Sequence, residues 1–192
     1  YLLFSLVLTY SFSFSQTFSF TYKGQVRSYI VHLPTGYVQG EELPLVLNFH
    51  GYTSNAGQQE SLSGFDAVAD TAHFIVVYPE GISKAWNAGI GFNGTIDDVG
   101  FASALIDTLH KNYNIDLNRV YSTGFSNGGF MSHRLACQLS NRIAAIGAVS
   151  GTIGTAAGLY KCIPTRKMPV LHIHGTSDAV VSYTGASFGT SV

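Results

Sequence analysis

One stretch of the chain, from Arg119 to Met131, constrains the fold more than any other. β-Branched and aromatic residues at 120–123 suit a buried parallel strand, and apolar residues recur at helical spacing after the glycines that follow. Between strand and helix lies Ser126, in the pattern Gly-x-Ser-x-Gly. Gly124 and Gly128 lack a β-carbon, so strand and helix can close on each other while the turn pushes the hydroxyl beyond the sheet edge. The pattern predicts a nucleophilic serine at a helix start, whose free N–H groups would stabilise an acyl oxyanion.

The pattern by itself is weak evidence, because glycine and serine are abundant in this chain. The segment from Gly185 to Gly189 matches it too, but no apolar strand leads directly into it, and we interpret it as a loop. For Ser126 the alternative is a serine that caps a helix in a glycine-rich turn. The strand before Ser126 and the helix after it favour the nucleophile.

Composition bounds the class of protein. With 192 residues and 46% hydrophobic content, the chain can bury about 70% of its unfolded surface in one domain. Charged residues make up 11%, the formal net charge is -1 and no run of Lys or Arg occurs, so we expect no nucleic-acid partner. Glycine, at 21 residues, follows no period, which fits an enzyme with many tight loops better than a collagen-like or disordered chain.

The first residues indicate an export signal. Residues 1–15 carry no charge, begin with an apolar run of signal-peptide length and end in small residues that suit a signal peptidase. A transmembrane helix is the alternative, but serine and threonine interrupt the run well short of the about 18 apolar residues that a span needs. We expect a signal-peptide remnant at 1–15, truncated at its start, before a domain at 16–192, and a secreted or periplasmic protein without a stable membrane span.

The two cysteines are consistent with export. Cys137 falls in the predicted helix after Ser126 and Cys162 in the loop before the next strand, so a disulfide would staple that loop to the helix. Two buried free thiols are the alternative. In the chain-entropy model a bridge here would contribute about 3 to 4 kcal/mol of stability.

The remaining segments predict strands that alternate with helices. Alternating residues at 17–22 and 25–33, joined by Lys23-Gly24, indicate an antiparallel hairpin. Further strands are expected at 45–49, 74–78, 144–149 and 169–174, and helices at 58–72, from residue 97 onward and after Ser126. This order predicts an α/β fold with a mostly parallel, doubly wound sheet.

The strand at 45–49 leads into His50, Gly51 and Tyr52 at the sheet edge where doubly wound folds hold their ligands. We expect the backbone N–H groups of Tyr52 and Asn127 to be the two oxyanion donors. The His50 side chain is expected to hydrogen-bond the loop, with substrate contact as the alternative. Trp86 lies in a loop predicted above the sheet, where it forms a wall for an aromatic or polymeric substrate or packs against the domain.

Two sets of acidic residues suggest catalysis. Asp97 and Asp98 open a predicted helix, where capping and the helix dipole explain them more economically. Asp178 follows both a strand and Ser126, so it suits the acid that orients a catalytic histidine; a turn cap is its alternative. All 7 histidines precede Asp178, so either the protein continues beyond Val192 or the chain lacks its general base.

Six motifs occur in order along the chain: Val-Leu-Asn-Phe-His-Gly-Tyr, Val-Val-Tyr-Pro-Glu-Gly, Trp-Asn-Ala-Gly, Asp-Asp-Val-Gly-Phe, Gly-Phe-Ser-Asn-Gly-Gly and His-Ile-His-Gly-Thr-Ser-Asp. With them the sequence resembles the polyhydroxybutyrate depolymerase and feruloyl esterase group of α/β-hydrolases, and it is similar to carbohydrate esterase family 1, from about residue 21 to residue 183. The resemblance implies a secreted serine esterase with nucleophile Ser126 and acid Asp178, and a catalytic histidine beyond the printed sequence. After Trp86 many relatives carry cysteines where this chain has Ile90, Gly91 and Phe92, so the resemblance implies no substrate preference.

We therefore predict a serine esterase that needs no metal or other cofactor and cleaves carboxylic esters, polymeric ones included, through an acyl-enzyme. The printed residues by themselves are expected to be nearly inactive, because only the oxyanion donors and substrate binding would remain. The alternatives are a non-catalytic binding protein on the same scaffold and a serine peptidase of the same fold. The sequence sets no oligomeric state.

Overall fold

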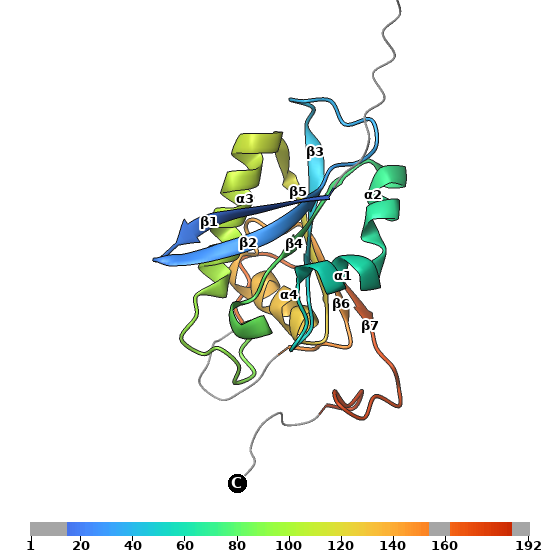
Figure 1. The fold of residues 1–192 in the computed structure, drawn as a ribbon. Helices are drawn as coiled ribbons and strands as arrows, with labels where there is room; N and C mark the ends of the chain where they lie inside the picture. The colour runs from blue at the N-terminus through green and yellow to red at the C-terminus, as the bar shows by residue number, and fades with distance from the viewer. Residues whose placement is uncertain (1–14, 154–161, 186–192) are drawn as a thin grey trace, which may run out of the picture.

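A computed structural model describes residues 15–153 and 162–185 (Figure 1). The predicted signal remnant lies outside this range except for Ser15, where the first strand begins. The second Gly-x-Ser-x-Gly match lies outside it except for Gly185.

In the described residues, a 7-stranded sheet has the order β1-β2-β4-β3-β5-β6-β7. The strands are β1 (Ser15–Tyr22), β2 (Gln25–His32), β3 (Leu43–Phe49), β4 (Ile75–Pro79), β5 (Ile115–Phe125), β6 (Ala145–Val149) and β7 (Val170–Ile173). β1 and β2 form the antiparallel hairpin and β2 runs antiparallel to β4, whereas every pair from β4 to β7 is parallel. The predicted α/β fold, with a mostly parallel sheet and an N-terminal antiparallel hairpin, is confirmed.

Helices cover both faces of the sheet (Figure 1). They are α1 (Ala56–Ser63) and α2 (Phe65–Ala72) on one face, α3 (Asp98–Tyr113) and α4 (Asn127–Gln138) on the other, and a short 3-10 helix, η1 (Ile82–Lys84). Side chains alternate along β3, so Leu45 and Leu47 join the core beneath α3 and α4 while Val46 joins a smaller core with Ala69 of α2. Across residues 15–153 and 162–185, none of the helices is both long and apolar enough to cross a bilayer.

The helix predicted at 58–72 is in fact two helices. Gly64 separates them with φ 61°, and its N–H donates to the carbonyl of Glu60 at 3.2 Å. Glycine takes this left-handed conformation at no steric cost, which makes it a common helix end. On the two sides of the break, α1 packs on β2, β3 and β4, and α2 packs on β4.

The paired acids at the start of α3 have different roles. Asp97 caps the helix, since its carboxylate accepts a backbone N–H of the first turn at 2.9 Å. Asp98 is fully buried and forms an ion pair of 2.8 Å with Arg27 of β2, which lies 3.7 Å from the ring centroid of Phe101. The capping prediction is confirmed for Asp97, and for Asp98 the buried ion pair is a finding that the sequence did not indicate.

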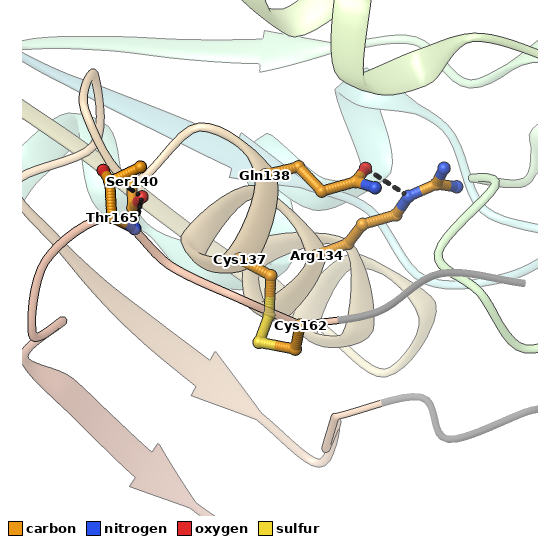
Figure 2. Close-up of a disulfide and its surroundings, with 6 residues drawn as sticks. All are labelled: Arg134, Cys137, Gln138, Ser140, Cys162 and Thr165. Carbon is orange, nitrogen blue, oxygen red and sulfur yellow. Dashed lines mark hydrogen bonds between the residues drawn. A yellow bond between two sulfur atoms is a disulfide. The ribbon is translucent and has the colours of Figure 1, made fainter.

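A disulfide joins Cys137 of α4 to Cys162 in the segment before β7, with the Cα atoms 4.8 Å apart (Figure 2). The predicted bridge is confirmed. Beside it the hydroxyls of Ser140 and Thr165 hydrogen-bond at 2.9 Å, and the Thr165 N–H donates to the same Ser140 oxygen at 2.8 Å. The bridge and these bonds hold the segment that leads into β7 against the end of α4.

Candidate active site

Ser126 lies in a sharp turn between the end of β5 and the first residue of α4. Its backbone has φ 51° and ψ -115°, a conformation that costs a residue other than glycine about 1 to 3 kcal/mol. The Ser126 N–H donates to the carbonyl of Val149 at 2.8 Å, and the Ser126 carbonyl accepts the N–H of Phe130 at 3.0 Å. Strain of this kind at a partly exposed serine favours a functional role over a plain helix cap.

The glycines on either side of Ser126 allow the turn to be this tight. A β-carbon on Gly124 would lie 2.5 Å from the carbonyl carbon of Gly128, and one on Gly128 would lie 2.0 Å from the carbonyl oxygen of Phe49. Both distances are far below van der Waals contact, so neither position accepts a side chain without backbone movement. The start of α4 is thereby pressed against the end of β3, as these glycines predict.

Two backbone N–H groups beside Ser126 donate no hydrogen bond within the described part of the chain. They belong to Tyr52, in the loop after β3, and to Asn127, the first residue of α4. The loop lies next to the serine, since a β-carbon on Gly51 would be 3.6 Å from the Ser126 Cβ. The N terminus of α4 adds partial positive charge here. Free, fixed N–H donors of this type can stabilise an oxyanion.

The side chain of Asn127 fixes the loop that contains Trp86. Its Oδ1 accepts the Trp86 N–H at 2.7 Å, and its Nδ2 donates to the Trp86 carbonyl at 3.2 Å. The indole N–H of Trp86 donates to the carbonyl of His50 at 3.0 Å, and Trp86 has no exposed surface. A side chain without exposed surface does not form the wall of a substrate site, so the structure favours the packing alternative for Trp86.

His50 supports the same loop from inside the domain. It is fully buried, its Nδ1 lies 2.7 Å from the carbonyl of Gly51, and its Nε2 lies 2.9 Å from the backbone N of Gly81. A backbone N–H can only donate, so Nε2 accepts, Nδ1–H donates and the imidazole is neutral. Burial also lowers the pKa of His50. The geometry therefore matches the expected loop-bonding role of His50 and leaves its side chain no surface for substrate.

Asp178 lies in the segment that follows β7. Its Oδ1 accepts the N–H groups of Val181 at 2.8 Å and Val180 at 2.9 Å. These two bonds, with the charge of nearby His174 and a hydrogen bond from Ser150, hold the pKa of the Asp178 carboxyl below its usual range. The group is therefore a fixed carboxylate at neutral pH.

Asp178 and Ser126 are brought to one edge of the sheet. The hydrogen bond partner of Asp178, Ser150, directly follows Val149, whose carbonyl accepts the Ser126 N–H. β5, β6 and β7 are parallel neighbours, so both contacts lie at the carboxyl ends of these strands. Two residues that are 52 positions apart, from 126 to 178, thus lie at the ends of strands in the same half of the sheet.

A row of three histidines connects α4 with Asp178, and sequence reasoning missed it. The ring centroids of His133 and His172 are 6.0 Å apart, and the Nε2 of His172 lies 3.2 Å from the Nδ1 of His174. The Nε2 of His174 is 2.6 Å from the carbonyl of Val181 and 3.5 Å from an Asp178 oxygen. The signal was available, because positions two apart on a strand, such as 172 and 174, face the same side.

We expect His133 to make the stability of the protein sensitive to acid. Burial and the charge of His172 lower its pKa to about 4, and its Nε2 has no partner among the described atoms. The pKa of a histidine in the unfolded chain is about 6.5. Between about pH 6.5 and about pH 4, His133 is therefore protonated in the unfolded state but neutral in the folded state. The free energy of unfolding should therefore fall by about 3 kcal/mol over this interval.

We expect His133→Asn to remove most of that loss, since the amide can replace the donor to the Gly151 carbonyl but does not titrate. Urea unfolding of the wild type and the variant, at intervals from pH 4 to pH 7, measures the difference. Parallel curves for the two proteins would show that another group causes the acid sensitivity.

The family model described as "Esterase PHB depolymerase" matches residues 27–180. The chain belongs to this family. A bifunctional acetylxylan esterase/xylanase from Neocallimastix patriciarum is 37% identical over 73% of the chain, and feruloyl esterase B from Piromyces equi is 35% identical over 83%. The chain spans 20% and 30% of the lengths of these two relatives.

Solved structures agree on the fold of this PHB depolymerase family member. A thermostable esterase superposes with a TM-score of 0.71 at 21% identity, covering 89% of this chain and 49% of the other. The ferulic acid esterase of carbohydrate esterase family 1 from Anaeromyces mucronatus gives 0.69 at 19% identity, covering 94% and 78%. At these identities the likeness establishes the α/β-hydrolase fold.

Every predicted site residue lies within the matched residues 27–180. None of the histidines in the described residues hydrogen-bonds to Ser126. Within residues 15–153 and 162–185, the Ser126 hydroxyl has no hydrogen bond, and the histidines bond elsewhere. Their partners are Asp70 for His32, Gly81 for His50, Glu41 for His73, Ile115 for His110, Gly151 for His133, and each other for His172 and His174. No group of His, Cys, Asp and Glu in the same residues is arranged to hold a metal ion.

Proposed function

We propose that this protein is a serine esterase that cleaves carboxylic esters through an acyl-enzyme, with Ser126 as the nucleophile. One observation carries the proposal: the strained, partly exposed serine lies beside two backbone N–H groups that donate to nothing else in the described residues. A serine that served only to begin a helix would need neither the strain nor the free donors of Tyr52 and Asn127.

In the proposed reaction the Oγ of Ser126 attacks the ester carbonyl carbon while its proton passes to an imidazole. The oxyanion accepts hydrogen bonds from the N–H groups of Tyr52 and Asn127. Collapse breaks the bond to the alcohol, which takes the proton from the imidazolium, and water then repeats the sequence to release the acid. The side chains of His50, Trp86 and Asn127 do not contact the substrate in this proposal. They hold in place the backbone around the two N–H donors.

Asp178 is the proposed acid of this triad, because its carboxylate is fixed and lies at the same sheet edge as Ser126. Its role is to orient the imidazole and to stabilise the imidazolium. The proposed general base is a histidine outside the printed sequence, since each of the 7 histidines in it bonds to groups other than Ser126.

The substrates we propose are feruloyl, acetyl-polysaccharide or polyhydroxyalkanoate esters. Support comes from the names of the relatives, an acetylxylan esterase/xylanase and a feruloyl esterase, and from the family description. We place the protein outside the cytoplasm, in the secreted or periplasmic compartment, because disulfides such as Cys137–Cys162 persist where the environment is oxidising.

Covalent labelling of the full-length protein tests the nucleophile. A fluorophosphonate probe should add to one serine, and peptide mass spectrometry should find the adduct on Ser126, with loss of 4-nitrophenyl acetate hydrolysis in proportion to labelling. An adduct on another serine would reject Ser126 as the nucleophile. A full-length protein that neither reacts nor hydrolyses esters would be the non-catalytic binding protein, and faster turnover of matched amides than esters would indicate the peptidase.

A further inference from the structure

Two aromatic rings stack on the surface next to the free N–H of Tyr52. The rings of Tyr52 and Phe92 have centroids 4.3 Å apart and planes within 10° of parallel. Tyr52 is 50% exposed, and its hydroxyl has no hydrogen-bond partner in the described part of the chain. An exposed tyrosine with a free hydroxyl and a ring held by a second ring can receive a ligand without first releasing another contact.

Hydrogen bonds and core packing hold the two loops that carry these rings. Phe92 is partly buried against the main core. The next residue, Asn93, donates from its side chain to the carbonyls of Ile82 at 2.6 Å and Ala85 at 3.0 Å. On the other side, the N–H of Thr53 donates to the carbonyl of Lys84 at 2.9 Å. The stacked pair is therefore a preorganised surface, which keeps the entropic cost of binding low.

The order of the strands indicates which part of an ester this surface meets. Tyr52 follows β3 and Phe92 follows β4, whereas Asp178 follows β7, with Ser126 at the end of β5 between them. The imidazole that Asp178 orients must protonate the leaving alcohol, so the alcohol lies toward β7. The acyl group, on the other side of the carbonyl carbon, then extends toward β3 and β4.

We propose that the Tyr52–Phe92 pair binds the acyl group of the substrate and selects planar aromatic acyl groups over short aliphatic ones. A flat conjugated ring can extend the existing stack as a third layer, and a polar substituent on it can bond the free Tyr52 hydroxyl. An acetyl group is too small to cover the ring. This inference rests on the proposed esterase activity and adds to it the residues that set acyl preference.

The test compares two esters of one alcohol, 4-nitrophenyl cinnamate and 4-nitrophenyl acetate, in the full-length protein. Tyr52→Ala and Phe92→Ala should each lower the ratio of kcat/KM for cinnamate to kcat/KM for acetate by about tenfold. The double variant should lose little more than either single one, because the two rings act as one unit. Tyr52→Phe keeps the ring and should retain most of the ratio.

Leu117→Ala is the matched control, since Leu117 is 45% exposed near the start of β5, at the opposite edge of the sheet. Its ratio should equal that of the wild type. A ratio unchanged in Tyr52→Ala and Phe92→Ala overturns the proposal. Equal losses on both esters also overturn it, because they would mean that the rings hold the loop or contact the common nitrophenyl group.

A binding measurement separates this inference from the proposed reaction. In Ser126→Ala, saturation-transfer NMR with methyl 4-hydroxycinnamate should detect binding, and adding Tyr52→Ala should weaken the Kd by about tenfold. If the full-length wild type hydrolyses neither nitrophenyl ester, the esterase proposal fails while this comparison still reports on the rings. Equal affinity with and without the Tyr52 ring would rule out the aromatic surface.

Discussion

Replacing Ser126 by alanine in the full-length protein should lower kcat for 4-nitrophenyl acetate by about 10⁴- to 10⁶-fold. The variant lacks the Oγ that we propose forms the acyl-enzyme, but keeps the proposed N–H donors of Tyr52 and Asn127, so residual turnover above the rate in water is expected. The Ser126 hydroxyl has no hydrogen bond in the described structure, so its removal should leave the fold intact. Initial rates at saturating ester, with unfolding curves for both proteins, provide the measurement.

The matched control is Ser19→Ala, at an exposed serine of β1 far along the sheet from β5, which should hydrolyse at the wild-type rate. A second variant, Ser126→Gly, addresses the strained backbone. It should be as inactive as Ser126→Ala yet more stable by about 1 kcal/mol, since glycine accepts the positive φ of 51° at this position. An active Ser126→Ala protein would end the nucleophile proposal.

The turn at Ser126 could be predicted because its causes are local. A β-branched strand, two glycines and a helical repeat all fall within thirteen consecutive positions, 119–131, and each one limits the backbone there. The disulfide could be predicted for a similar reason, since the flanking segments placed Cys137 on a helix and Cys162 in the next loop. The parallel sheet followed from the alternation of strand and helix segments.

Features that depend on distant contacts could not be predicted in this way. Arg27 and Asp98 are 71 positions apart, and their charges gave no sign that both would be buried in one ion pair. The burial of Trp86 depends on the Asn127 amide, which holds its backbone from 41 positions away. The break at Gly64 is different: it was local, but a helical pattern tolerates one glycine, and only its left-handed φ shows that the helix ends there.

The same limit applies to the surface near the serine. Tyr52 was selected for its backbone N–H, because the loop after a central strand supplies that donor in many esterases. The role that we propose for its ring depends on the structure, in which the ring of Phe92, 40 positions later, stacks parallel to it. Side chains that meet across two loops leave no periodic pattern in the sequence.

Asp178→Asn in the full-length protein should lower kcat by about 10⁴-fold with little change in KM. The amide oxygen can still accept the N–H groups of Val180 and Val181, so the segment keeps its shape. What is lost is the negative charge that, in the proposed mechanism, sets the imidazole tautomer and stabilises the imidazolium. The lowered pKa keeps wild-type Asp178 ionised at neutral pH, so the contrast with the amide persists across the working range.

A control residue separates this electrostatic role from a plain turn cap. Asp116 also accepts a backbone N–H two residues on, from Asn118 at 2.9 Å, but it lies near the start of β5, at the far end of the strand from Ser126. If Asp178 were only a cap, Asp178→Asn would behave like Asp116→Asn and keep full activity. Asp178→Ala removes the cap and the charge together, so it should lose stability as well as kcat. If activity falls only in the variants that lose stability, Asp178 serves the turn alone. If Asp178→Asn is stable but inactive, Asp178 takes part in the reaction.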